Sequence, residues 1–123
     1  MIPETLKDVM KHEGVVAIGT TGKDGIHMVN TWNSYLRISP DGNLLIPVGH
    51  MRKTEANLAH NPTVLLTLGT REVKGAHGPG TGFMIKGKGE FVTSGSDFDA
   101  MKAQFVWARA VLRVKVESAT QTL

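Results

Sequence analysis

The segment at residues 48–57, VGHMRKTEAN, is a candidate anion-binding site. We expect a strand to end at Gly49 and a helix to follow, with Thr54 as its N-cap residue. The first turn of a helix exposes unpaired N–H groups with a positive potential, so a phosphate binds there readily. Lys53 would add a full positive charge and Thr54 a hydroxyl. The alternative is an ordinary solvated helix start that exposes Arg52 and Lys53 to water.

The segment at residues 27–36, HMVNTWNSYL, combines amides, a hydroxyl and aromatic rings where a plain core strand would alternate aliphatic and charged residues. Along a strand, successive side chains point to opposite faces of the sheet. One face then carries Asn30, Trp32 and Ser34, and the other carries Thr31, Asn33 and Tyr35. The first face suits a planar heteroaromatic ring, because the amide and the hydroxyl can reach the ring edge while the indole packs against it. The alternative is a contact surface between subunits, where Trp and Tyr are enriched.

Other familiar motifs fail on spacing or context. The stretch GTTGKDG (19–25) has its first two glycines too close for a Walker A loop, so we expect a hairpin turn there. The stretch GPGTGF (78–83) leads into an expected strand, whereas a dinucleotide-binding loop leads into a helix. None of the five histidines has a second ligand at i+2 or i+4, and there is no cysteine. We therefore expect no metal site, no thiolate nucleophile and no disulfide.

The composition suits one globular domain that spans residues 1–123, since 41% of the residues are hydrophobic and 20% are charged. No segment has the roughly 20 consecutive apolar residues of a membrane span, and the first residues lack the apolar stretch of a signal peptide. A cytoplasmic protein is therefore the expectation. The net charge of +3 is dispersed along the chain, which favours a single anionic ligand over nucleic acid.

Hydrophobic periodicity and turn residues predict a mainly β, antiparallel fold with about six strands and three short helices, and therefore a barrel or a sandwich. The expected helices cover 4–13, 53–60 and 96–109, the last with Ser96 as its N-cap residue. The expected strands cover 15–20, 27–36, 44–49, 63–73, 83–92 and 110–118. Pro47 indicates a sheet edge or a local break in the third of these strands.

The two candidate segments together point to one ligand. A phosphate pocket at a helix start, beside a face with polar and aromatic groups, fits a nucleotide-like molecule with a fused ring. Flavin mononucleotide (FMN) has both parts.

Several stretches, in order along the whole chain, resemble the small FMN-binding members of the flavin-binding split-barrel superfamily, which also includes pyridoxamine-phosphate oxidases and flavin reductases. These stretches are VVAIGTTGKDGIHMVNTWNSYL, PVGHMRKTEAN, HGPGTGF, WARA and the terminal ATQTL. The resemblance implies a six-stranded antiparallel split β-barrel with short flanking helices. It also implies a homodimer that holds one noncovalent FMN per subunit.

The resemblance assigns the residues that would bind this cofactor. It implies that Lys53 and Thr54 bind the phosphate. It further implies that Trp107 packs near the ring and that Leu123 reaches the flavin from the second subunit. The other flavin-site residues that it implies are Asn30, Thr31, Trp32, Ser34, Pro47, Val48, Gly49 and Gly82. Without the resemblance, Trp107 would be an ordinary core aromatic residue.

The resemblance implies an electron-transfer flavoprotein that carries one or two electrons for an unidentified redox protein. The sequence offers no nucleophile, general base or metal-ligand set for a substrate, which agrees with a carrier. A flavin reductase or an oxidase of the pyridoxamine-phosphate type is the alternative on the same fold, and a nucleic-acid-binding barrel ranks last. His50 and Arg52 stand where the family has glycine and histidine, so we expect FMN affinity to differ while the Lys-Thr pair is kept.

Overall fold

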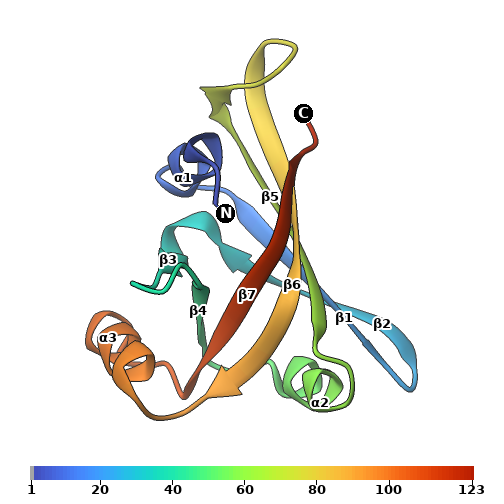
Figure 1. The fold of residues 1–123 in the computed structure, drawn as a ribbon, viewed down its shortest axis with the longest axis vertical. Coiled ribbons are helices and arrows are strands. Elements are labelled where there is room, and N and C mark those ends of the chain that lie inside the picture. Colours follow the sequence, from blue (N-terminus) through green and yellow to red (C-terminus); the bar gives the residue numbers. More distant parts are fainter. Residues whose placement is uncertain (1) are drawn as a thin grey trace.

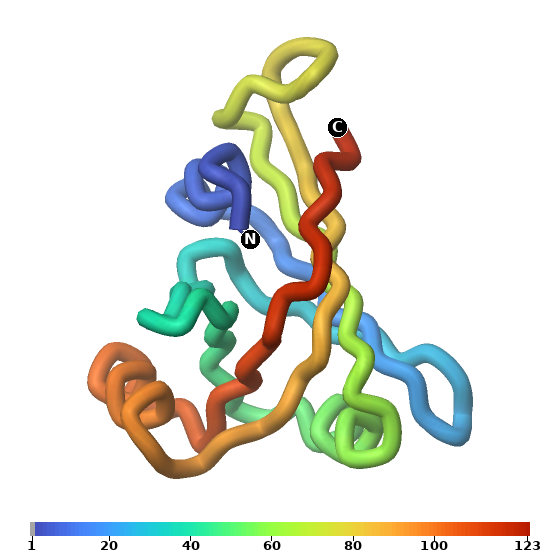
Figure 2. The backbone as a smooth tube through the Cα atoms, viewed as in Figure 1, coloured from blue at the N-terminus to red at the C-terminus, as the bar shows by residue number. Residues whose placement is uncertain are grey.

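An antiparallel sheet curls around the core in the computed structural model, which describes residues 2–123 (Figure 1 and Figure 2). The strands are β1 (Val15–Gly22), β2 (Gly25–Trp32), β3 (Arg37–Ile38), β4 (Leu44–Val48), β5 (Thr63–Lys74), β6 (Pro79–Val92) and β7 (Ala110–Gln121). They lie in the order β2-β1-β5-β6-β7-β4-β3 across the sheet. The helices are α1 (Glu4–Met10), α2 (Arg52–His60) and α3 (Ser96–Gln104), and a 3-10 turn, η1 (Asn33–Tyr35), follows β2.

The mainly β, antiparallel architecture with three short helices is confirmed. Seven strands are described where six were expected, because the two-residue β3 pairs with Leu44 and Leu45 of β4. The third helix is shorter than expected. It ends at Gln104, since the backbone of Phe105 leaves the helical region at φ −126°, and a loop leads on to β7.

Both expected N-cap residues are wrong. The residue before α2 is Met51, which has a left-handed backbone with φ 55°, so Thr54 lies inside the first turn of the helix. The residue before α3 is Gly95, with φ 99°, so Ser96 is the first helical residue. In each case the chain enters the helix through a backbone turn that the side-chain pattern does not reveal.

Alternating side chains of the long strands fill the core. The inward-facing residues of β5, β6 and β7 include Val64, Leu66, Leu68, Phe83, Ile85, Leu112 and Val114. Burial of each large apolar side chain stabilises the fold by about 1.5–3 kcal/mol. A smaller cluster lies on the opposite side of β4 and β7, where Met101 and Phe105 pack against Val111. This cluster fixes α3 and the loop after it to the outside of the sheet.

Asn33 directly follows β2 and ties the chain there to three carbonyl groups in two distant segments, the end of α1 and β5. It is fully buried, and its Nδ2 lies 3.0 Å from the carbonyl oxygens of both His12 and Gly69 and 3.4 Å from that of Val9. The strand therefore stops at Trp32 instead of continuing to Leu36. The predicted alternation is wrong beyond this point, since residues 33–35 form the turn η1.

Pro47 lies where β4 has a strand on one side only. β4 pairs with β7 along its whole length, including Pro47 opposite Val111, but it pairs with β3 only at Leu44 and Leu45. The predicted local sheet edge at Pro47 is confirmed, and it leaves the end of β4 open toward the region described below.

We expect Asn33→Asp to destabilise the protein by about 3 kcal/mol at neutral pH, because a buried carboxylate would face carbonyl oxygens that now receive N–H groups. These surroundings favour the protonated carboxyl, so its pKa rises in the folded state above the unfolded value of about 3.9. The loss of stability relative to the wild type should therefore be small below about pH 4 and should grow as the pH rises. Urea unfolding from pH 4 to 7 measures this.

The control for that measurement is Asn61→Asp, because Asn61 uses its Oδ1 to accept from the N–H of Thr63 at 3.1 Å, a bond that a carboxylate can keep. Equal pH profiles for the two variants would contradict the role given to Asn33.

Candidate functional site

An open pocket of about 560 Å³ lies where β2 and β4 end and the loop after α3 crosses them. Its volume is in the range of small-molecule sites. Its lining residues are Val29, Asn30, Thr31, Trp32, Tyr35, Pro47, Gly49, His50, Met51 and Trp107. Trp32 and Trp107 are 46% and 48% exposed, so two large indole surfaces are open to a ligand.

The structure brings together six of the residues predicted for the flavin region: Asn30, Thr31, Trp32, Pro47, Gly49 and Trp107. Val48 lies between Pro47 and Gly49 in the chain, but its side chain is buried in the core. Prediction from the sequence missed four pocket residues: Val29, Tyr35, His50 and Met51. Strand alternation assigned Tyr35 to the opposite face, and only the turn η1 brings it back to the pocket.

Two aromatic rings that line the pocket, Tyr35 and Trp107, pack with the buried ring of Phe105. The ring centroids of Tyr35, Phe105 and Trp107 lie 5.3–5.8 Å apart in tilted or edge-on arrangements, distances at which aromatic pairs attract one another. Trp107 also packs over Gly49, where an added Cβ would come within 3.4 Å of the indole. The indole is therefore held against both the aromatic cluster and the end of β4.

Lys102 at the end of α3 holds the loop that carries Trp107. Its Nζ donates to the carbonyl oxygens of Val106, at 2.6 Å, and Ala108, at 2.7 Å. These two residues flank Trp107 in the chain. One ammonium group thus fixes the backbone on both sides of the indole.

The first turn of α2 begins three residues after β4. Thr54 in this turn is 1% exposed, and its Oγ1 has no hydrogen-bond partner within residues 2–123. The first N–H groups of a helix also lack partners within the helix. An unpaired buried hydroxyl beside unpaired N–H groups is an arrangement that a phosphate would satisfy.

Lys53 is engaged in an exposed ion pair in this structure. Its Nζ lies 2.8 Å from Oδ2 of Asp24, which belongs to the turn between β1 and β2. The hydrogen bond from Lys53, together with its charge, lowers the pKa of the Asp24 carboxyl. Exposed pairs contribute little to stability, so an incoming anion can compete with Asp24 for this ammonium.

Besides Val48, Lys53 and Thr54, three more predicted site residues do not line the pocket. Ser34 is exposed, and its hydroxyl donates to Oε2 of Glu13 at 2.8 Å, a bond that lowers the pKa of Glu13. Gly82 accepts from the N–H of Thr122 at 2.8 Å, and the carbonyl of Leu123 accepts from Thr81 at 2.7 Å. Gly82 and Leu123 are thus near each other at the C-terminal end of β7, whereas α2 lies at the opposite end of the sheet (Figure 1).

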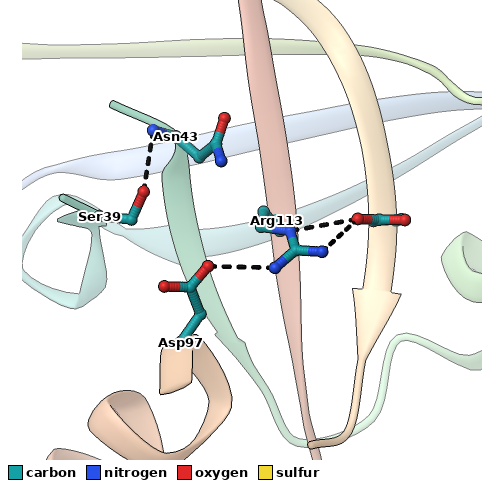
Figure 3. Close-up of polar contacts among 5 residues, drawn as sticks. Ser39, Asn43, Asp97 and Arg113 are labelled. Atoms are coloured by element: carbon teal, nitrogen blue, oxygen red, sulfur yellow. Dashed lines mark hydrogen bonds and ion pairs between the residues drawn. The ribbon is translucent and has the colours of Figure 1, made fainter. Parts of the chain in front are cut away.

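A second opening, of about 610 Å³, lies over β6 and β7 and is lined mainly by charged and polar residues. Arg113 in this opening pairs with Glu90 and, at 3.1 Å, with Asp97, and these bonds raise the pKa of its guanidinium (Figure 3). The carboxylates therefore satisfy its charge. No aromatic side chain lines this opening, which makes it less suited to a ring-bearing ligand than the first pocket.

Two further observations bear on the kind of site. Residues 2–123 contain no group of three His, Cys, Asp or Glu side chains placed to hold a metal ion. None of the helices in this range is long and apolar enough to cross a membrane.

Comparison with known proteins identifies a family and a relative that match over almost the whole chain. Residues 2–122 match the family model described as pyridoxamine 5'-phosphate oxidase. The FMN-binding protein of Nitratidesulfovibrio vulgaris (strain DSM 19637 / Miyazaki F) is 55% identical over 123 residues, which cover 100% of both chains.

Solved structures agree on the fold at low sequence identity. HupZ of Group A Streptococcus aligns with a TM-score of 0.79 at 19% identity, over 98% of this chain and 94% of that one. An FMN-binding protein from Syntrophomonas wolfei subsp. wolfei aligns with a TM-score of 0.75 at 14% identity, over 98% and 85% of the two chains. These similarities confirm the predicted split-barrel fold.

We expect Lys102→Met to release the Trp107 loop, because it removes both carbonyl contacts and keeps an apolar stem. In a Trp32→Phe background Trp107 is the only tryptophan left. Its fluorescence emission should shift to the red and its anisotropy should fall, while the far-ultraviolet circular dichroism stays unchanged. Lys86→Met, at an exposed position of β6, is the matched control. Unchanged emission and anisotropy would contradict the clamp.

Proposed function

This chain belongs to the pyridoxamine 5'-phosphate oxidase family, and we propose that it binds FMN noncovalently as an electron-transfer flavoprotein. One observation carries the proposal: three residues of the aromatic pocket, Gly49, His50 and Met51, directly precede a helix start that holds an unpaired buried hydroxyl. FMN joins a flat tricyclic ring to a phosphate. The 55% identity to a protein named for FMN binding supports the choice of this ligand.

The chain's own groups would bind and orient the cofactor. Lys53 and Thr54, with the first N–H groups of α2, would hold the phosphate. Trp32, Trp107 and Gly49 would position the ring, and Asn30 and Thr31 are placed to meet its polar edge or the chain that links ring and phosphate.

When bound, FMN supplies the capacity to accept and release one or two electrons. Backbone N–H groups at the ring edge would stabilise added negative charge and raise the potential. Apolar cover by Trp32 and Trp107 would have the opposite effect, because burial disfavours charge. Ser34, Val48, Gly82 and Leu123 keep their predicted cofactor roles as proposals, and a cytoplasmic location is likewise proposed.

The absorption spectrum of the purified protein tests the proposal. The protein should be yellow, with flavin absorption bands, and the fluorescence of its flavin should be quenched by the nearby indoles. A colourless protein that also fails to bind added FMN would contradict the proposed function.

We expect Lys53→Ala to weaken FMN binding roughly tenfold to a hundredfold, since a charge-assisted hydrogen bond is worth about 1.5–3 kcal/mol. Riboflavin, which lacks the phosphate, should lose much less affinity. Asp24→Asn should strengthen FMN binding, because it frees Lys53 from its ion pair. Calorimetric titration with both ligands measures this.

Lys88→Ala is the control for net charge, because Lys88 lies on β6 and does not line the pocket. Equal losses for FMN and riboflavin in Lys53→Ala would show that Lys53 does not contact the phosphate.

We further propose a homodimer formed through an apolar sheet face. Ile26 and Met28 are 78% and 57% exposed, and they line a depression of about 290 Å³ together with Leu65 and Met84. Met28 and Trp32 point to the same side of β2, so this face continues into the flavin pocket. A second copy of the chain would cover both the apolar sheet face and the flavin pocket. Leu123 of the partner subunit would then reach the ring, which accounts for its position away from the pocket of its own chain.

We expect Met28→Arg to give a monomer by sedimentation, because the two-fold contact would bring the new charges together in an apolar interface. Flavin fluorescence should rise in that monomer as the partner's cover is lost. Deletion of Leu123 should leave the dimer intact and cause a similar rise. A monomeric wild-type protein, or a Leu123 deletion with an unchanged flavin spectrum, would contradict this arrangement.

The alternative function is a flavin reductase or an oxidase of the pyridoxamine-phosphate type. The open pocket favours it, because a substrate can reach the ring site of a single subunit. Steady oxidation of NAD(P)H with FMN would support the reductase, whereas a carrier exchanges electrons only with a redox protein.

A further inference from the structure

Arg109 connects the Trp107 loop to the turn between β4 and α2. Its backbone N–H donates to the carbonyl of Val48 at 2.8 Å. Its guanidinium donates to the carbonyl of His50 through Nε, at 3.1 Å, and through Nη2. Nη2 also lies 2.9 Å from Oε1 of Glu55 on α2. The Arg109 side chain is 21% exposed and that of Glu55 is 38% exposed, so this ion pair is partly buried.

The contacts of Arg109 enclose a strained residue. Met51 has φ 55°, a left-handed conformation that persists in a residue with a side chain only when its surroundings enforce it. His50 precedes Met51, and Glu55 donates its backbone N–H to the Met51 carbonyl at 3.0 Å. Arg109 thus holds the chain before the turn and the helix after it.

This turn determines the direction in which α2 starts. Unpaired N–H groups bind an anion only when they point toward one spot. If the Met51 turn relaxed, the first turn of α2 would fray, and its N–H groups and the Thr54 hydroxyl would lose their shared orientation. Gly49, His50 and Met51 also line the ring pocket, but its two indoles lie outside this turn. Trp32 ends β2, and Tyr35 and Phe105 pack against Trp107. We therefore expect the ring pocket to be affected less than the phosphate end.

We propose that Arg109 is a positioning residue for the phosphate end of the site: it sets the start of α2 without touching the ligand. This inference rests on the proposed FMN function. The charge of Arg109 pairs with Glu55, and its Nε and Nη2 donate to a carbonyl and a carboxylate of the chain. Arg109 therefore acts through geometry, in contrast to Lys53, which acts through its charge.

The test compares FMN with riboflavin in Arg109→Gln and Arg109→Lys. The ratio of the riboflavin Kd to the FMN Kd should fall about tenfold in Arg109→Gln, with riboflavin affinity within about twofold of the wild type. In Arg109→Lys this ratio should fall about threefold. An ammonium can keep the contact with Glu55 or the contact with the His50 carbonyl, but it cannot make both in the geometry of a guanidinium. Hydrogen exchange of the Glu55 amide in the ligand-free protein should accelerate in Arg109→Gln.

Arg113→Gln is the matched control, since Arg113 also pairs with carboxylates but lies outside the pocket. Its riboflavin-to-FMN ratio should equal that of the wild type. The ratio in Arg109→Lys decides the matter if Arg109→Gln does not fold.

The possible failures are distinguishable. A wild-type protein that binds FMN no better than riboflavin would overturn the phosphate site and this inference together. A wild-type preference for FMN that both Arg109 variants keep would overturn this inference alone. Equal weakening of FMN and riboflavin would also overturn it, because that result indicates a general structural role.

Discussion

The short turn between β4 and α2 is the constraint on which the site depends. Only Gly49, His50 and Met51 separate the strand from the helix, and the chain reverses within that length because Met51 is left-handed. Gly49 belongs to the aromatic pocket, and the next element starts the candidate phosphate site. The turn therefore sets the distance between the two ends of a ligand, as a fixed spacer would.

Strand pairing, core packing and the Trp107 loop all hold the strand that leads into this turn. β4 pairs along its whole length with β7, and Ile46 and Val48 are fully buried in the core. Trp107 covers Gly49 from outside, and Lys102 fixes the loop that carries the indole. Pairing and packing thus leave few alternative positions for the pocket walls. Binding of a ring would therefore lose little conformational entropy in ordering them. The cation at the helix start differs, because the exposed pair between Lys53 and Asp24 is readily exchanged.

The sequence was sufficient to predict the fold class, since alternation in β5, β6 and β7 reports directly which side chains face the core. The two candidate ligand-binding segments were also visible, because helix starts and clustered aromatic and amide residues have local signatures. The turn η1 was not predictable from alternation: Asn33 looks like one more polar strand residue until its three carbonyl partners are known. The role of Thr54 likewise depends on Met51, whose left-handed backbone has no side-chain signature. Arg109 contacts the carbonyl of His50, which is far away in the chain. Lys102 contacts the carbonyls of Val106 and Ala108 in the loop after its helix. No rule of sequence spacing predicts either contact.

The central claim is that one ligand occupies the aromatic pocket and the start of α2 at the same time. Nuclear magnetic resonance of the ¹⁵N-labelled protein, titrated in parallel with FMN and riboflavin, tests it most directly. Both ligands should shift the indole N–H signals of Trp32 and Trp107, and only FMN should strongly shift the backbone amides of Arg52, Lys53 and Thr54. Amides at the start of α2 that do not respond to FMN, with the largest changes instead around Lys88 and Lys115, would contradict the account.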